Sequence, residues 1–203
     1  MASNIILIGI MVILIAAVAA LVLLHNGRQL AITPSLTTTP SVMTIQPSTT
    51  TVQTYSASPY MTQSQAQTLI GAITSQTTKV YNTSAEIAGL GGQFFGGQFT
   101  GNVTAVWIAS YNNTNNQSIT DLVVLSPDAQ ALYAKMTGSA PSYATFGAQN
   151  GMNYMFIRNT TNNNAAGEGL IGWKGDYVTM AFTSRITNIT AASLSELVAS
   201  DLP

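Results

Sequence analysis

Residues 169–183 read GLIGWKGDYVTMAFT, two apolar runs joined by a short polar turn. The turn residues Lys174, Gly175 and Asp176 are typical of a tight β-hairpin, and the flanking runs have the β-branched and aromatic residues of strands. Working outward, the same pattern predicts strands over 103–111, 119–125, 152–158, 169–173 and 177–183, with shorter ones over 79–82 and 143–146. Neighbouring hairpins favour an antiparallel sheet, because no βαβ alternation appears that would build a parallel one.

Three amphipathic helices accompany these strands, each preceded by a residue that can cap a helix. The capping residues are Thr62, Ser126 and Thr190, and Gln65 stands at the capping-box position of the first helix. Apolar residues follow at helical spacing: Ala66, Leu69, Ile70 and Ile73; Ala129, Leu132, Tyr133 and Met136; Ala191, Leu194, Leu197 and Val198. We therefore expect an α+β head, an antiparallel sheet with three helices packed on it. The caps lie 64 residues apart, which fits either a diverged duplication or coincidence.

Charge is scarce throughout the chain. The 203 residues hold six Lys or Arg and seven Asp or Glu, with a formal net charge of −1. This balance provides no basic surface for nucleic acid, so we expect no nucleic-acid partner. The chain has no Cys and one His, His25, which excludes disulfides, thiolate catalysis and most metal sites. Seventy-two Ser, Thr, Asn and Gln residues supply polar surface instead.

Residues Ile5–Leu24 form an uninterrupted run of 20 uncharged, mostly apolar residues. A helix of that length spans about 30 Å, the thickness of the hydrocarbon core of a bilayer. The run favours a retained transmembrane anchor over residues 1–28, although Ala17-Val18-Ala19 has the form of a signal-peptide cleavage site. By the positive-inside rule, Arg28 would place the following chain in the cytoplasm, whereas the composition of that chain favours an extracellular head.

Residues 29–61 are predicted to form a low-complexity stalk. Between Ala31 and Met61 the chain has 14 Ser or Thr and four Pro, which oppose helix formation and favour an extended backbone. Residues 51–55 (TVQTY) alternate in polarity and are a candidate strand that pairs with the head or with a neighbour. The remaining residues, 62–203, are numerous enough for one domain with its own core.

Six asparagines stand in N-x-Ser/Thr sequons and are candidate N-glycosylation sites: Asn82, Asn102, Asn112, Asn116, Asn159 and Asn188. They favour a surface that faces the outside of the cell. Residues 89–101 contain two copies of Gly-Gly-Gln-Phe, which predict a bent loop or a bulged strand edge. In this loop, Phe94, Phe95 and Phe99 are candidate contacts for a partner subunit.

No catalytic, cofactor-binding or metal-binding set of residues stands out, so we expect neither an enzyme nor a cofactor. His25 directly follows the membrane run, which excludes a Ser-His-Asp triad in the head. Three carboxylates have no evident role in a cap or turn: Glu86, Asp121 and Glu168. No spacing among them indicates a glycosidase pair, and structural roles are favoured. Trp107 and Trp173 lie on predicted strands and are expected in the core.

In its layout the chain resembles the anchored surface proteins of archaea, with a hydrophobic N-terminal helix, a Ser/Thr/Pro stalk and a sequon-bearing head poor in charge. Archaeal pilins share the helix, but the residues before the run and the long stalk after it do not favour a type IV filament. The resemblance implies a non-enzymatic envelope component, at the cell membrane with its head outside. Its partners would be the lipid bilayer, other surface proteins and copies of itself.

Two alternatives remain open at this stage. One is an accessory single-pass subunit of a larger membrane complex, and the other is a solute-binding or sensor head. The scarcity of charge also suggests an acidic exterior, because carboxylates lose their charge at low pH while amides and hydroxyls are unaffected.

Overall fold

The structure of the chain, a computed structural model, describes residues 58–94, 102–159, 167–186 and 189–203. The predicted membrane run and most of the predicted stalk lie outside these residues. The described elements are α2 (Gln63–Ile70), β1 (Ile73–Tyr81), α3 (Ser84–Phe94), β2 (Ala105–Asn113), β3 (Ser118–Leu125), α4 (Ala129–Thr137), β4 (Thr145–Gln149), β5 (Met152–Asn159), β6 (Gly167–Lys174), β7 (Tyr177–Ser184) and α5 (Ala191–Asp201). In this described part, no helix has the length and apolar character that crossing a bilayer requires.

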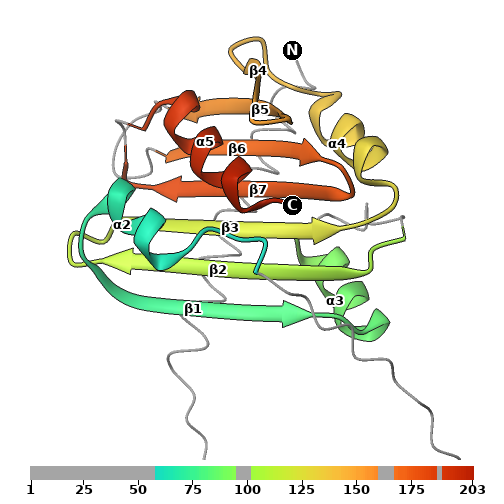
Figure 1. The fold of residues 1–203 in the computed structure, drawn as a ribbon, viewed down its shortest axis with the longest axis horizontal. Coiled ribbons are helices and arrows are strands. Elements are labelled where there is room, and N and C mark those ends of the chain that lie inside the picture. Colours follow the sequence, from blue (N-terminus) through green and yellow to red (C-terminus); the bar gives the residue numbers. More distant parts are fainter. Residues whose placement is uncertain (1–57, 95–101, 160–166, 187–188) are drawn as a thin grey trace, which may run out of the picture.

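The described strands form one antiparallel sheet in the order β1-β2-β3-β7-β6-β5-β4 (Figure 1). Two meanders, β1–β3 and β4–β7, meet where β3 pairs with β7, and Asp121 lies opposite Ala181 near the middle of that pair. The predicted turn between β6 and β7 is present at Gly175 and Asp176, and Gly175 adopts a φ of 54°. The prediction of an antiparallel α+β head is confirmed.

Helices cover both faces of the sheet, so the head has three layers. We call the side covered by α2 and α5 the first face, and the side covered by α3 and α4 the second face; Figure 1 shows α2 and α5 in front of the sheet. In β3, Ile119 and Val123 belong to the first-face core, whereas Leu122 and Val124 belong to the second-face core. Because successive side chains of a strand point to opposite faces, the central strands supply both cores and are apolar nearly throughout.

The head has a fourth described helix, α3, so the prediction of three helices is wrong. The predicted loop beginning at Gly89 is also wrong in its first part, because residues 89–94 belong to α3. Thr83 caps this helix together with Glu86: the Glu86 N–H donates to Thr83 Oγ1 (3.4 Å), and Thr83 Oγ1 donates to Glu86 Oε2 (2.8 Å). Ile87 and Leu90 then bury themselves in the second-face core. The Thr-x-x-Glu signature of a helix start is present in the sequence, but three glycines within α3 obscure it because Gly is a poor helix former.

The other elements differ from prediction mainly at their ends. The capping boxes at Thr62 and Thr190 are confirmed. Helix α2 ends at Ile70, so Ile73 does not belong to its apolar stripe; Gly71, at a φ of 77°, turns the chain into β1 instead. β1 is accordingly longer than the predicted strand over 79–82, because it pairs with β2 along nearly its whole length.

The structure gives no support to an internal duplication. Two duplicated halves would be related by a half-turn about the normal to the sheet, which exchanges β1 with β5, β2 with β6 and β3 with β7. This rotation would keep every helix on its own face. Helices α2 and α4, which precede the two meanders, lie on opposite faces. The 64-residue spacing also fails at the second cap, because α4 begins only at Ala129, after a turn in which Ser126 Oγ accepts from the Asp128 N–H (3.1 Å).

The packing of the first face predicts an effect of a single methyl group. A Cβ atom at Gly172 of β6 would lie 2.5 Å from Met152 Sδ and 3.0 Å from Thr179 Cγ2, and both neighbours are 0% exposed. We expect Gly172→Ala to lower the free energy of unfolding by about 1–3 kcal/mol, measured by urea denaturation. At Gly89 of α3 a Cβ would meet nothing within 4 Å, so Gly89→Ala should leave stability unchanged or raise it. Equal stability of Gly172→Ala and the wild type would contradict this packing.

Candidate functional site

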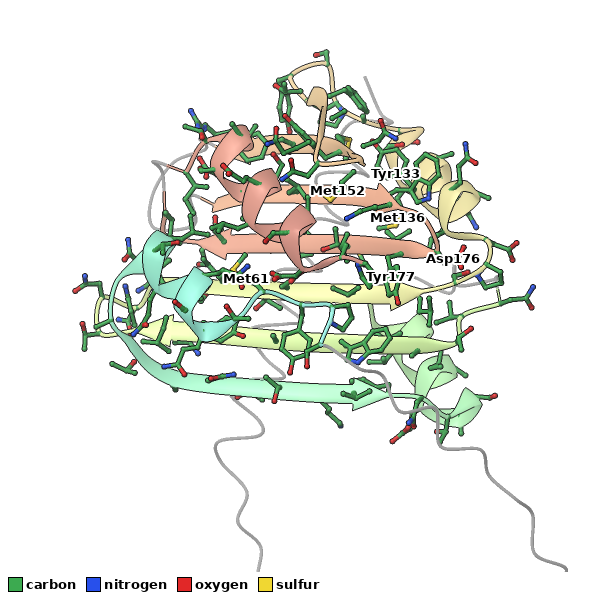
Figure 2. The ribbon with its side chains drawn as sticks, in the orientation of Figure 1. Met61, Tyr133, Met136, Met152, Asp176 and Tyr177 are labelled. Carbon is green, nitrogen blue, oxygen red and sulfur yellow. The ribbon has the colours of Figure 1, made fainter. Side chains whose placement is uncertain are left out.

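The chain enters the head along the first face, just ahead of α2. Pro59 and Met61 are buried there, and Met61 is 0% exposed. Figure 2 labels Met61 in front of the sheet, on the same side as α2 and α5. A buried segment outside helices and strands needs other partners for its backbone N–H and C=O groups. In this head, side chains of the sheet provide them.

Asp121 of β3 and Tyr111 of β2 bind the backbone of Met61. The Met61 N–H donates to Asp121 Oδ2 (2.8 Å), and the Tyr111 hydroxyl donates to the Met61 carbonyl oxygen. The second carboxylate oxygen of Asp121 accepts from Thr179 Oγ1 of β7 (3.0 Å). Asp121 is 1% exposed and Tyr111 is 0% exposed. Residues of three neighbouring strands thus hold the point at which the chain enters the head.

Gln65 extends this network to the C-terminal helix. Its Oε1 accepts from the N–H of Thr62 (2.6 Å) in the capping box of α2, and its Nε2 donates to both carboxylate oxygens of Asp201 in α5 (2.9 Å each). One side chain therefore fixes the start of α2 and ties it to the end of α5. We refer to the whole network as the junction; its members are Met61, Gln65, Tyr111, Asp121, Thr179 and Asp201.

Burial controls the acidity of the junction. It raises the pKa of Asp121 to about 6, against the lowering effect of the hydrogen bonds from Met61 and Thr179. Burial also raises the pKa of Asp201, although the hydrogen bond from Gln65 lowers it. The pKa of Tyr111 is raised to about 12, first by burial and then by the neighbouring Tyr60 and Asp121. Since a hydroxyl such as that of Thr179 can donate or accept, the junction can also accommodate a protonated Asp121.

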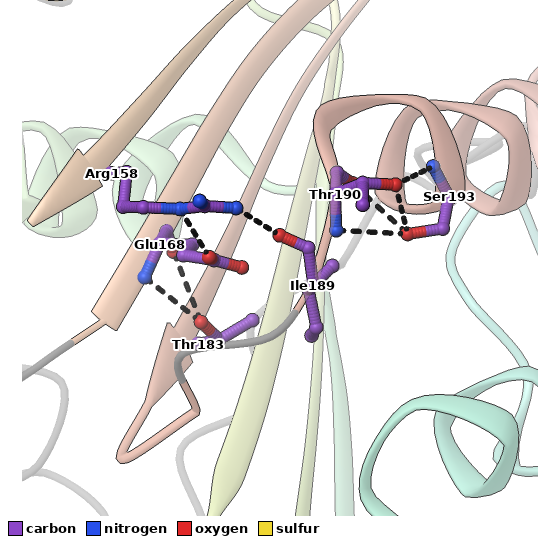
Figure 3. Close-up of polar contacts among 6 residues, drawn as sticks. All are labelled: Arg158, Glu168, Thr183, Ile189, Thr190 and Ser193. Carbon is purple, nitrogen blue, oxygen red and sulfur yellow. Dashed lines mark hydrogen bonds and ion pairs between the residues drawn. The ribbon is translucent and has the colours of Figure 1, made fainter.

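A second polar cluster connects β5 and β6 to the segment before α5 (Figure 3). Arg158 Nε forms an ion pair with Glu168 Oε1 (2.9 Å), and Arg158 Nη2 donates to the Ile189 carbonyl oxygen (2.9 Å). Thr183 Oγ1 accepts from the backbone N–H of Glu168 (2.9 Å). Burial raises the pKa of Glu168, and Arg158 opposes this shift. The cluster holds the residue that precedes the Thr190 cap.

The carboxylates without an evident role in the sequence all have structural contacts. Glu86 caps α3, Glu168 pairs with Arg158, and Asp121 belongs to the junction. Over the described ranges, no three His, Cys, Asp or Glu side chains are grouped so that they could hold a metal ion. His25 lies outside those ranges. That the chain is not an enzyme and takes no cofactor stays a prediction.

Two exposed candidate glycosylation sites lie at the ends of strands. Asn82 directly follows β1, and Asn116 lies in the turn between β2 and β3, where it adopts a φ of 56°. Antiparallel pairing of β1 with β2 puts these two sites at opposite ends of the sheet. Both are positions at which a bulky glycan can be accommodated.

The remaining sequons are less accessible or lie outside the described side chains. Asn102 is exposed, but its Nδ2 donates to Asp128 Oδ2 (3.3 Å). Asn112 is half-buried within β2, and its Nδ2 donates to Ser75 Oγ (3.1 Å), so it is poorly suited to carry a glycan. The side chains not described are those of Asn159 and Asn188.

The predicted partner loop is only partly described. Phe94 is the last residue of α3, which corrects its placement in a loop, while Phe95 and Phe99 lie outside the described residues. The expectation of a core position is confirmed for Trp107, which is 3% exposed in the first-face core, whereas Trp173 is only half-buried where it packs against the second-face core.

Comparisons with protein-family models, with curated proteins and with solved structures give no match. The function of the chain must therefore be argued from its own residues. Sequence reasoning did not anticipate the junction, although part of its signal is visible. Asp121 interrupts the apolar run Ile119–Leu125 at a position on the same face as Ile119 and Val123. Its partner Met61, 60 residues away, follows from the fold alone.

The junction predicts that the chain is more stable in mild acid than at neutral pH. The pKa of Asp121 in the folded chain, about 6, lies above the ordinary value of about 4, so the folded state binds this proton more tightly than the unfolded state. The resulting stabilisation is complete below about pH 4 and is lost as the pH rises through 6, amounting to about 3 kcal/mol at most. We therefore expect the Tm to rise between pH 7 and pH 4.

Two variants test the origin of this rise by calorimetry. Asp121→Asn has no titrating group at this position and should make the rise in Tm clearly smaller. Asp128→Asn changes an exposed carboxylate and should retain the rise. A wild-type Tm that falls steadily from pH 7 to pH 4, or a rise that Asp121→Asn leaves unchanged, would refute this assignment.

Proposed function

We propose that the chain is a membrane-anchored, non-enzymatic surface protein, whose N-glycosylated head is held outside the cell on a Ser/Thr/Pro stalk. The observation that carries this proposal is the junction. The first residues of a domain are usually poorly ordered unless contacts tie them down. Here Met61, at the boundary of the predicted stalk, is bound by buried side chains of β2 and β3. Such a connection suits a head that is held by its N-terminal end.

The distribution of charge supports a location in an acidic exterior. Residues 62–203 contain only 12 charged residues, so the head has few groups that could form ion pairs. A surface made of amides and hydroxyls keeps its hydrogen-bonding capacity at pH values where carboxylates become neutral. The buried carboxyls of Asp121 and Glu168 and the half-buried carboxyl of Asp201 all have raised pKa values, so acid favours the folded state at these positions too.

The position of the accessible sequons supports an outward-facing, glycosylated head. Asn82 and Asn116 are exposed at opposite ends of the sheet, where glycans can be accommodated. The exposed residues of β1 between them, of which Lys79 alone is charged, are suited to contacts with other envelope components. The partners of the proposed protein are therefore the bilayer and neighbouring surface molecules.

Membrane attachment and glycosylation can be measured together on the full chain, produced in a host that performs N-glycosylation. We expect the chain to remain with the membranes after an alkaline carbonate wash, and external protease to release the head from intact cells. Mass spectrometry should find glycans on Asn82 and Asn116 and none on Asn112. Asn82→Gln and Asn116→Gln should each lose one glycan mass, whereas Asn112→Gln should lose none.

Recovery of the chain in the soluble fraction, or full protection from external protease, would overturn the proposal. Isolation in mild detergent separates it from the main alternative. Co-purification with a fixed stoichiometry of other proteins would indicate an accessory subunit of a larger complex rather than an independent envelope component.

A further inference from the structure

Strand β1 is an unusually open edge of the sheet. It is nine residues long and pairs on one side with β2; within the described ranges no element pairs with its other side. Residues 74–80 are exposed on both faces, and Val80 retains 46% of its accessible surface. The opposite edge, β4, has only five residues. A long edge strand presents a row of backbone N–H and C=O groups that can pair with another strand.

The composition of β1 suits pairing with a polar strand. Its sequence, ITSQTTKVY, is rich in Thr and contains no Pro, so each residue whose N–H faces the open side can donate it. Its only charge is Lys79, and the ammonium group lies 4.5 Å from the ring centroid of Tyr81. This contact holds the charge on the second face, beside the strand's own residues.

We propose that β1 pairs antiparallel with β1 of a second copy of the chain and joins the two sheets into one. This inference rests on the proposed function for the identity of the partner, a neighbouring copy anchored in the same membrane. A register centred on Thr77 places Thr77 opposite Thr77 of the second copy. In the regular part of the strand the neighbouring pairs are Ser75 with Lys79 and Gln76 with Thr78, and the irregularity between Ile73 and Ser75 ends the register there.

This register brings complementary side chains together. Each Lys79 faces Ser75 of the other copy, so the two ammonium groups never stand directly opposite. The central Thr77–Thr77 pair is favourable across antiparallel strands, whereas like charges directly opposite are unfavourable.

The symmetry of the pair also fits two chains rooted in one membrane. Two copies of one strand that pair antiparallel with each other are related by a two-fold axis normal to the sheet. This rotation leaves the first faces of both copies on the same side of the joined sheet. Met61 lies on the first face in both copies. Both predicted stalks would therefore begin on the same side of the joined sheet, as anchoring in a common bilayer requires. The sequon residues Asn82 and Asn116 lie outside residues 75–79, so glycans on them start beyond the paired segment.

The absence of Cys from the chain allows a clean cross-linking test in native membranes. Directly opposite residues of antiparallel strands have Cα atoms about 4.5–5.5 Å apart, a distance that a disulfide spans. Under mild oxidation, full-length Thr77→Cys should give a covalent dimer on a non-reducing gel. Thr68→Cys, an exposed position on α2, is the matched control and should give several-fold less.

A charge variant tests the same edge independently of the disulfide. Adding Gln76→Lys and Thr78→Lys to Thr77→Cys would place lysines opposite lysines in the proposed register, and the dimer should fall several-fold. Adding Gln67→Lys and Thr68→Lys instead introduces the same charge on α2 and should leave the dimer unchanged. Circular dichroism of each variant verifies that the head remains folded.

Three results would overturn the proposal: no Thr77→Cys dimer, equal dimer from Thr68→Cys, or a dimer that resists the paired lysines on β1. The first includes the case in which residues 51–55 of the same chain occupy the edge. A cross-link to a different protein would equally overturn pairing between copies. The carbonate wash on the same membranes reports separately on anchoring, so a failure of the proposed function is distinguishable from a failure of strand pairing.

Discussion

The peptide groups of Met61 are buried beneath the first-face helices, and Asp121 and Tyr111 provide the hydrogen bonds that this burial requires. A buried N–H or C=O left without a partner costs about 1–3 kcal/mol, so the entry of the chain depends on these two side chains. Helix α2 begins two residues later, and Gln65 in its first turn binds Asp201 of α5. The position of both first-face helices thus follows from how the chain enters.

The same constraint explains how a head with few charges can still use carboxylates. Asp121 and Asp201 are placed where burial raises their pKa values, and their hydrogen-bond partners, Thr179 and Gln65, are uncharged. The hydroxyl of Thr179 can accept a hydrogen bond from a protonated Asp121, so this contact survives acid, whereas a surface stabilised by ion pairs loses its contacts. The scarcity of charge on this chain and the raised pKa values of its carboxyls therefore have the same consequence, a fold that tolerates acid.

The antiparallel sheet could be predicted because its hairpins carry local signals, such as Gly175-Asp176. The helices that begin after Thr62 and Thr190 could be predicted because their capping residues are local signals too. Helix α3 could have been predicted from Thr83 and Glu86, had its glycines been given less weight. The extent of β1 could not be predicted, because β1 is a strand through its pairing with β2 and has no apolar pattern of its own. The junction could be predicted least of all, since Asp121 and Met61 are 60 residues apart and only the completed fold brings them together.

Native-state hydrogen exchange of the Met61 amide tests most directly whether the junction builds the entering segment into the core. The account predicts that this amide is protected about as strongly as that of Val123 at the centre of β3, and that Tyr111→Phe reduces its protection more than that of Val123. Exchange of the Met61 amide as fast as that of the exposed Ser58 would contradict it.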